Sequence, residues 1–181
     1  MIVLLCERTV VNGIRFCHTI CHMILVTHAI IGSAIGHRAS SVLVAFVMGF
    51  ASHYIFDMIP HWHYPVPKIE AAVFMPFGKK SITLDRRYWP EFGRILADLT
   101  LGILISLFLF NGSLMIVLAA AVGAVLPDLL VGFSKFNPVP ALVWHDRFHR
   151  WIHTTTRLDD YHVFGILSQA SIIVISIWIF S

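Results

Sequence analysis

The stretch VLVAFVMGFASHYIFDMIPHWH, residues 42–63, begins as an apolar run and ends in three histidines and an aspartate. The run has the composition of a membrane helix, and Pro60 ends it because proline cannot donate the next helical hydrogen bond. His53 and Asp57 are four residues apart, so both lie on one face of this helix. Such a polar face at the end of an apolar helix indicates a binding site rather than a simple membrane anchor.

The composition of the whole chain is that of a membrane protein. Of its 181 residues, 57% are hydrophobic and 13% are charged, whereas soluble domains have about 45–50% and roughly 25%. The apolar residues form five blocks, at about 23–36, 41–58, 95–110, 114–132 and 162–180. We therefore expect an all-α fold, an integral membrane bundle of about five helices. The net charge of +3 is small and scattered, so no nucleic-acid partner is expected.

The basic residues predict how the bundle is oriented. If all five blocks span the membrane, 12 of the 13 Lys and Arg lie on the side of the N-terminus, and only Arg38 lies on the other. Positive residues stay on the cytoplasmic side. We therefore expect a multi-pass protein of the cell inner (cytoplasmic) membrane, with the N-terminus in the cytoplasm and the C-terminus outside.

The first 22 residues form a separate segment. They contain all three cysteines, Cys6, Cys17 and Cys21, and the last two are too far apart for the haem-attachment signature. Met23 would be a natural start, so residues 1–22 are interpreted as an N-terminal extension that a misassigned start site would explain. Residues 23–181 are then a single membrane-embedded helical domain, and the extension has no part in the site.

Ionisable residues in the membrane helices occur at one depth. They lie at the cytoplasmic end of each helix or its flank, and they are His28, His53, Asp57, Asp98, Asp128, His149 and His153. An ionised carboxylate in a membrane helix costs a few kcal/mol, so it normally has a partner. The histidines of the last cluster also repeat at intervals of four residues, counting from His145. We therefore predict that the seven residues are ligands of one metal site at the cytoplasmic ends of the helices.

The ligand types predict the metal and its chemistry. Imidazole and carboxylate together suit Zn²⁺ best, with Mn²⁺ and Fe²⁺ as alternatives. Such ions make hydroxide from water near neutral pH, and two of them can clamp a phosphoester. The leading prediction is thus a metal-dependent hydrolase of a phosphoester. A phospholipid headgroup is a candidate substrate because the site lies at headgroup depth. Asp128 and His149 are the predicted catalytic residues.

Two further segments are expected to meet the membrane surface. ALVWHDRFHRWIH, residues 141–153, has an aromatic stripe beside its histidine stripe, which is typical of an interfacial helix. The loop from residue 59 to residue 94 carries six basic residues, and four of them either contact anionic lipid headgroups or bind a substrate phosphate. These residues are Lys79, Lys80, Arg86 and Arg87.

Three motifs resemble the YdjM-like family of membrane-bound, metal-dependent hydrolases. They are Thr27-His28-Ala29, Leu126-Pro127-Asp128 and His149-Arg150 with His153-Thr154, and the likeness covers about residues 23–180. In the family, the last motif has one more residue between its histidines. The proline-aspartate motif of the family usually has a second aspartate two positions on, where this chain has Leu130. A more distant likeness relates His53, Asp57, Pro60 and His63 to zinc-dependent phospholipase C, an all-helical phosphoesterase. The resemblance implies hydrolysis but names no substrate.

Each of these residues also has an ordinary structural alternative. Asp98 could be protonated and bonded to a backbone carbonyl, and Asp128 could simply end a helix. His61, His63 and His145 could lie at the interface or at the rim of the site. The alternative function is therefore a non-catalytic membrane protein, either a scaffold or a carrier of metal or protons. A carrier needs polar residues through the full bilayer, and the far halves of these helices are nearly all apolar.

Overall fold

The computed structural model describes residues 9–11, 14–16, 25–62, 86–153, 158 and 161–180. The helices are α1 Leu25–Gly36, α2 Val42–Asp57, α4 Trp89–Leu109, α5 Leu114–Phe136, α6 Pro140–Ile152 and α7 His162–Phe180. A short 3₁₀ helix, Arg86–Tyr88, leads into α4. In the N-terminal extension β1, Thr9–Val11, pairs antiparallel with β2, Ile14–Phe16. The described part of residues 23–181 is all-helical, as predicted.

Three helices are long and apolar enough to cross a membrane, judged by length and composition. They are α4, the first 21 residues of α5 (Leu114–Ser134) and α7. The helices α1 and α2 are apolar but have only 12 and 16 residues, about 18 and 24 Å at the usual rise, against a hydrocarbon core of about 30 Å. A helical membrane protein is therefore indicated, but the predicted count of about five membrane helices is not confirmed.

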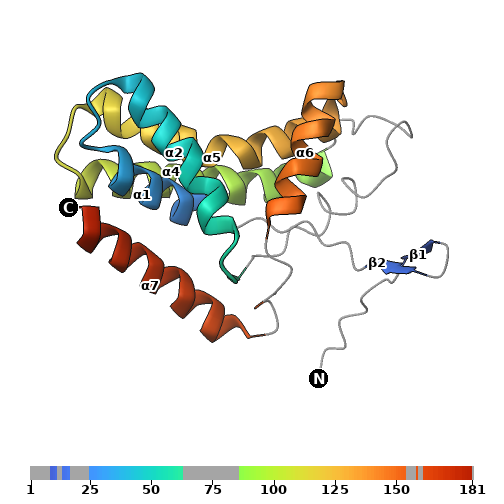
Figure 1. The fold of residues 1–181 in the computed structure, drawn as a ribbon. Helices are drawn as coiled ribbons and strands as arrows, with labels where there is room; N and C mark the ends of the chain where they lie inside the picture. Colours follow the sequence, from blue (N-terminus) through green and yellow to red (C-terminus); the bar gives the residue numbers. More distant parts are fainter. Residues whose placement is uncertain are drawn as a thin grey trace.

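The short helix α1 lies at the centre of the bundle. It packs against α2, α4, α5 and α7 (Figure 1), and most of its residues are buried. The surrounding helices therefore cover the apolar surface of α1. This explains why a helix too short to span a membrane can lie inside the bundle.

Small residues bring α2 unusually close to α5. A Cβ atom on Gly49 of α2 would collide with the backbone of Ala120, and one on Gly123 of α5 would collide with the backbone of Phe46. Such small-residue contacts are the usual way for membrane helices to approach one another. The close approach fixes the depth at which side chains at the end of α2 meet α5.

The two tight turns of the bundle lie against each other. A Cβ atom on Gly112, between α4 and α5, would lie 3.0 Å from the carbonyl oxygen of His37, between α1 and α2. At 1.5 Å per residue, Asp128 of α5 lies about 20 Å from this turn, and α5 continues for about 12 Å beyond Asp128. The end of α2 that faces Asp128 therefore lies within the length of α5, not beyond its end.

Helix α6 crosses the end of the bundle and contacts α5 and α2 (Figure 1). Trp144 and Trp151 are 65% and 79% exposed, and both rings pack against Phe148, at centroid distances of 5.4 and 6.2 Å. Asp146 and His149 of the same helix are buried. The predicted amphipathic character of this segment is thus present, with the two tryptophans outside and Asp146 and His149 inside.

Candidate metal centre

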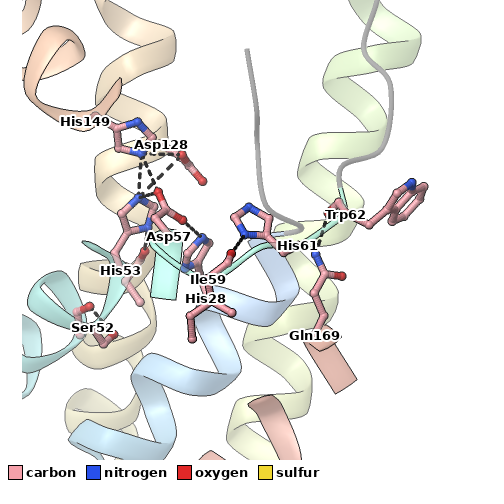
Figure 2. Close-up of polar contacts among 12 residues, drawn as sticks. His28, Ser52, His53, Asp57, Ile59, His61, Trp62, Asp128, His149 and Gln169 are labelled. Carbon is pink, nitrogen blue, oxygen red and sulfur yellow. Dashed lines mark hydrogen bonds and ion pairs between the residues drawn. The ribbon is translucent and has the colours of Figure 1, made fainter. Parts of the chain in front are cut away.

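Four of the predicted ligands meet in one buried group, which we call the α2–α5–α6 group. Its members are His53, Asp57, Asp128 and His149, and their ligand atoms all lie within 4.8 Å of one another. They come from three helices that are far apart in the sequence (Figure 2). The structure therefore brings polar residues of α2, α5 and α6 to one point.

The ligand atoms of this group face a common centre. Asp57 Oδ2 lies 3.1 Å from His53 Nε2 and 3.0 Å from His149 Nε2. Asp128 Oδ1 lies 3.8 and 3.3 Å from the same two nitrogens, which are 2.9 Å apart. Two carboxylates and two imidazoles this close repel one another unless a proton or a metal ion lies between them.

A backbone carbonyl of α5 fixes the tautomer of His53. Its Nδ1 lies 2.8 Å from the carbonyl oxygen of Ala124 in α5, and a carbonyl can only accept, so Nδ1 donates. In a neutral ring Nε2 then carries a lone pair, and this lone pair points toward the carboxylates. Metal-binding histidines are commonly oriented in this way by a backbone carbonyl.

The surroundings of His149 shift its pKa strongly. Burial by itself would lower its pKa, but hydrogen bonds to Asp128 and Asp57 outweigh burial and raise the pKa to about 10. The two carboxylates therefore hold a proton on His149, and a divalent ion entering the centre would replace that proton.

A second group shares Asp57 with the first. It consists of Asp57, His61 and His153, whose ligand atoms also lie within 4.8 Å of one another. The sequence left His61 open between an interfacial role and a ligand role. His61 follows Asp57 by four residues, but α2 ends at Asp57, so helical spacing does not apply across this step.

Two predicted ligands lie beside these groups. His28 of α1 is buried, and its Nε2 is 3.1 Å from Asp57 Oδ1, while its ring lies 4.2 Å from that of His53. Asp98 of α4 instead accepts a hydrogen bond from the backbone N–H of Val26, at 3.4 Å, at the N-terminus of α1. A negative charge is favourable at that helix end, so the structure gives Asp98 a position outside both groups.

Tyr54 is a nearby residue that the sequence analysis missed. Its hydroxyl lies 2.9 Å from Nε2 of His145, and its ring is edge-on to that of His53. Burial, followed by the charges of His149 and His53, lowers the pKa of His145. Tyr54 and His145 thus form a wall of the centre; His145 contacts this tyrosine and belongs to neither ligand group.

Several predictions fall on residues that the structure leaves undescribed. His63, Lys79, Lys80, the side chain of Arg87 and the three cysteines lie outside the described residues. Arg86 is described and exposed, at the start of the 3₁₀ helix. The predicted substrate-binding role of the four basic residues therefore stays a prediction.

The α2–α5–α6 group could hold a metal ion. Two imidazole nitrogens and two carboxylate oxygens make a donor set that suits Zn²⁺, Mn²⁺ or Fe²⁺, and the geometry does not choose among them. Comparisons of the chain with protein-family models, curated proteins and solved structures find no match.

Proposed function

We propose that this chain is a membrane-bound hydrolase that binds a divalent metal ion, Zn²⁺ first among the candidates, in the α2–α5–α6 group and cleaves a phosphoester. The observation that carries this proposal is the convergence of two buried carboxylates on two imidazole nitrogens at 3.0 to 3.8 Å. Here one centre gathers all four.

The four side chains have different tasks in this proposal. When bound, a divalent ion lowers the pKa of water and polarises a phosphoryl oxygen. His53 and Asp57 orient the site, because the Ala124 carbonyl fixes His53 and the two lie one helical turn apart. Asp128 and His149 are the least enclosed members, at 5% and 3% exposure. They are therefore the two ligands nearest to an approaching substrate.

The depth of the group supports a lipid substrate. Asp128 lies within the length of the spanning helix α5, which continues about 12 Å past it. The exposed tryptophans of α6 lie across the same end of the bundle, as expected of a helix at the membrane interface. A phosphoester at headgroup depth, in the cytoplasmic leaflet of the inner membrane, would reach the group from the side of the bilayer.

The motif likeness points in the same direction. His28, Asp128, His149 and His153 carry the resemblance to the YdjM-like hydrolases, and all four lie in or against the two ligand groups. His53 and Asp57, which carry the likeness to zinc-dependent phospholipase C, belong to the first group. Both likenesses are to metal-dependent hydrolases, so both favour hydrolysis at a metal-loaded centre.

The test is metal content followed by activity of the full-length protein in detergent. We expect at least about one ion per chain, and hydrolysis of a generic phosphodiester or a phospholipid that a chelator abolishes and Zn²⁺ or Mn²⁺ restores. Protein without bound metal and without hydrolysis would favour the alternative, a scaffold or carrier. A protein that binds metal but hydrolyses no phosphoester would be a metal-binding membrane protein, and the proposed hydrolase activity would be refuted.

A further inference from the structure

The two carboxylate oxygens of Asp57 contact different histidines. Its Oδ2 lies 3.1 and 3.0 Å from the nitrogens of His53 and His149, and its Oδ1 lies 3.1 Å from His28 Nε2. The same residue also lies within ligand distance of His61 and His153. A carboxylate shared by two groups of nitrogen donors has the position of a bridging ligand, and paired catalytic ions lie about 3.5–4 Å apart.

His61 is prepared as a ligand in the same way as His53. It is fully buried, and its Nδ1 lies 2.6 Å from the carbonyl oxygen of Ile59 (Figure 2). Since the carbonyl only accepts, Nδ1 donates, and the neutral ring directs a lone pair from Nε2. Two histidines, one from each ligand group, thus share this backbone-carbonyl arrangement.

Helix α7 holds the irregular segment that carries His61. Gln169 Nε2 donates to the carbonyl of Trp62 at 2.6 Å, and Ser168 Oγ donates to the carbonyl of Pro60 at 3.0 Å. Gly165 gives room for this contact, because a Cβ atom there would collide with Trp62. The residues on both sides of His61 are therefore fixed by one helix, although the segment itself has no helical hydrogen bonding to hold it.

We propose that the protein binds a second divalent cation through Asp57, His61 and His153, that Asp57 bridges the two ions, and that Gln169 of α7 is a positioning residue for the second site. This inference rests on the proposed function for its first ion. Three protein ligands leave a coordination position for water or for a phosphoryl oxygen, as in catalytic zinc sites. A pair of ions suits the in-line displacement of a phosphoester.

The experiment is a titration of the metal-free, full-length protein with Mn²⁺, followed by metal analysis and electron paramagnetic resonance. We expect about two ions per wild-type chain and the spectrum of a coupled manganese pair. His61→Ala and His153→Gln should each retain about one ion, with the spectrum of isolated Mn²⁺. Gln169→Leu should weaken only the second ion, by roughly 10- to 100-fold.

His37→Ala is the matched control. His37 is also buried, and its Nδ1 donates to a backbone carbonyl, that of Ala34 at 2.8 Å, but it lies at the opposite end of the bundle. The control should keep both ions. A thermal melt of each variant establishes that it is folded. If His61→Ala does not fold, the metal content of His153→Gln tests the second site.

The outcomes separate this inference from the proposed function. Wild-type protein with about one ion, unchanged in His61→Ala, would overturn the second site and leave the first standing. Two ions retained in both His61→Ala and His153→Gln would also overturn it. Wild-type protein without any ion would overturn the second site and the proposed function together.

Discussion

At the level of single residues, Asp57 is the side chain on which both ligand groups depend. It contacts His28, His53 and His149 within 3.1 Å and is shared with His61 and His153. Asp57→Asn keeps the shape but removes the charge and one ligand oxygen. We expect metal content to fall to near zero, with affinity reduced by at least about 100-fold. Metal analysis after dialysis against a fixed free Zn²⁺ concentration measures it. Wild-type occupancy in the variant would show that Asp57 is no ligand.

Asp98→Asn tests the residue for which sequence and structure differ. The sequence predicts a ligand, whereas the structure places the carboxylate at the N-terminus of α1, where it accepts from Val26 N–H. An asparagine oxygen can accept the same hydrogen bond, so we expect full metal content and a change in unfolding free energy within about 1 kcal/mol. The two aspartate variants are made in parallel and assayed together. Loss of metal from Asp98→Asn would restore the sequence-based prediction.

At the level of elements, the contact between α2 and α5 decides where His53 lies. Gly49→Ala would force a Cβ atom into the backbone of Ala120 and push the helices apart. We expect a loss of about 1–3 kcal/mol from overpacking, together with weaker metal binding, because His53 loses its contact with the Ala124 carbonyl. Gly132→Ala in α5 is the control, since its Cβ would meet nothing within 4 Å. Thermal melts with and without added Zn²⁺ measure both effects. Equal melting of the two variants would contradict the packing argument.

Helix α6 is the element that we expect to lie at the membrane surface. Trp151→Ser removes an exposed ring, 79% accessible, from the aromatic face without touching the buried His149. We expect unchanged metal content and unchanged hydrolysis of a soluble phosphodiester, but slower hydrolysis of phospholipid in vesicles, because interfacial tryptophans anchor the helix at headgroup depth. Equal loss of activity on both substrates would mean that Trp151 supports the fold rather than the membrane contact.

At the level of the whole molecule, the distribution of charge predicts the topology. The turns at residues 37–41 and 110–113 should lie outside and the loop containing Lys79 in the cytoplasm, because 12 of the 13 basic residues fall on that side. Single cysteines at positions 79 and 112, in a background without the three native cysteines, can be labelled in intact cells with a reagent that does not cross membranes. We expect labelling at position 112 only. Labelling at position 79 instead would show that the orientation is the reverse of the predicted one.

The sequence by itself determined that the chain is helical, that it is apolar enough for a membrane, and that one end of it carries histidines and aspartates. Those conclusions need only composition, local hydrophobic pattern and the four-residue spacing of His53 and Asp57, all of which are read along a single helix. The same reasoning predicted that α6 is amphipathic, because the spacing of its apolar and polar residues is a property of one helix. The predicted count of about five membrane helices is not confirmed, because α1 and α2 have only 12 and 16 residues and α1 is buried by neighbouring helices.

Tertiary structure alone decided which polar residues meet. The Ala124 carbonyl that orients His53 is 71 residues away in the chain, and the position of His61 follows from an irregular segment held by Ser168 and Gln169 of α7. Asp98 has the same residue type and the same expected depth as Asp128, yet it faces the start of α1 instead of the centre. Depth in a membrane follows from position along a helix, but the direction a side chain faces follows from helix rotation and packing. Glycine contacts set that packing between α2 and α5, through Gly49 and Gly123, and between α4 and α1, through Gly102.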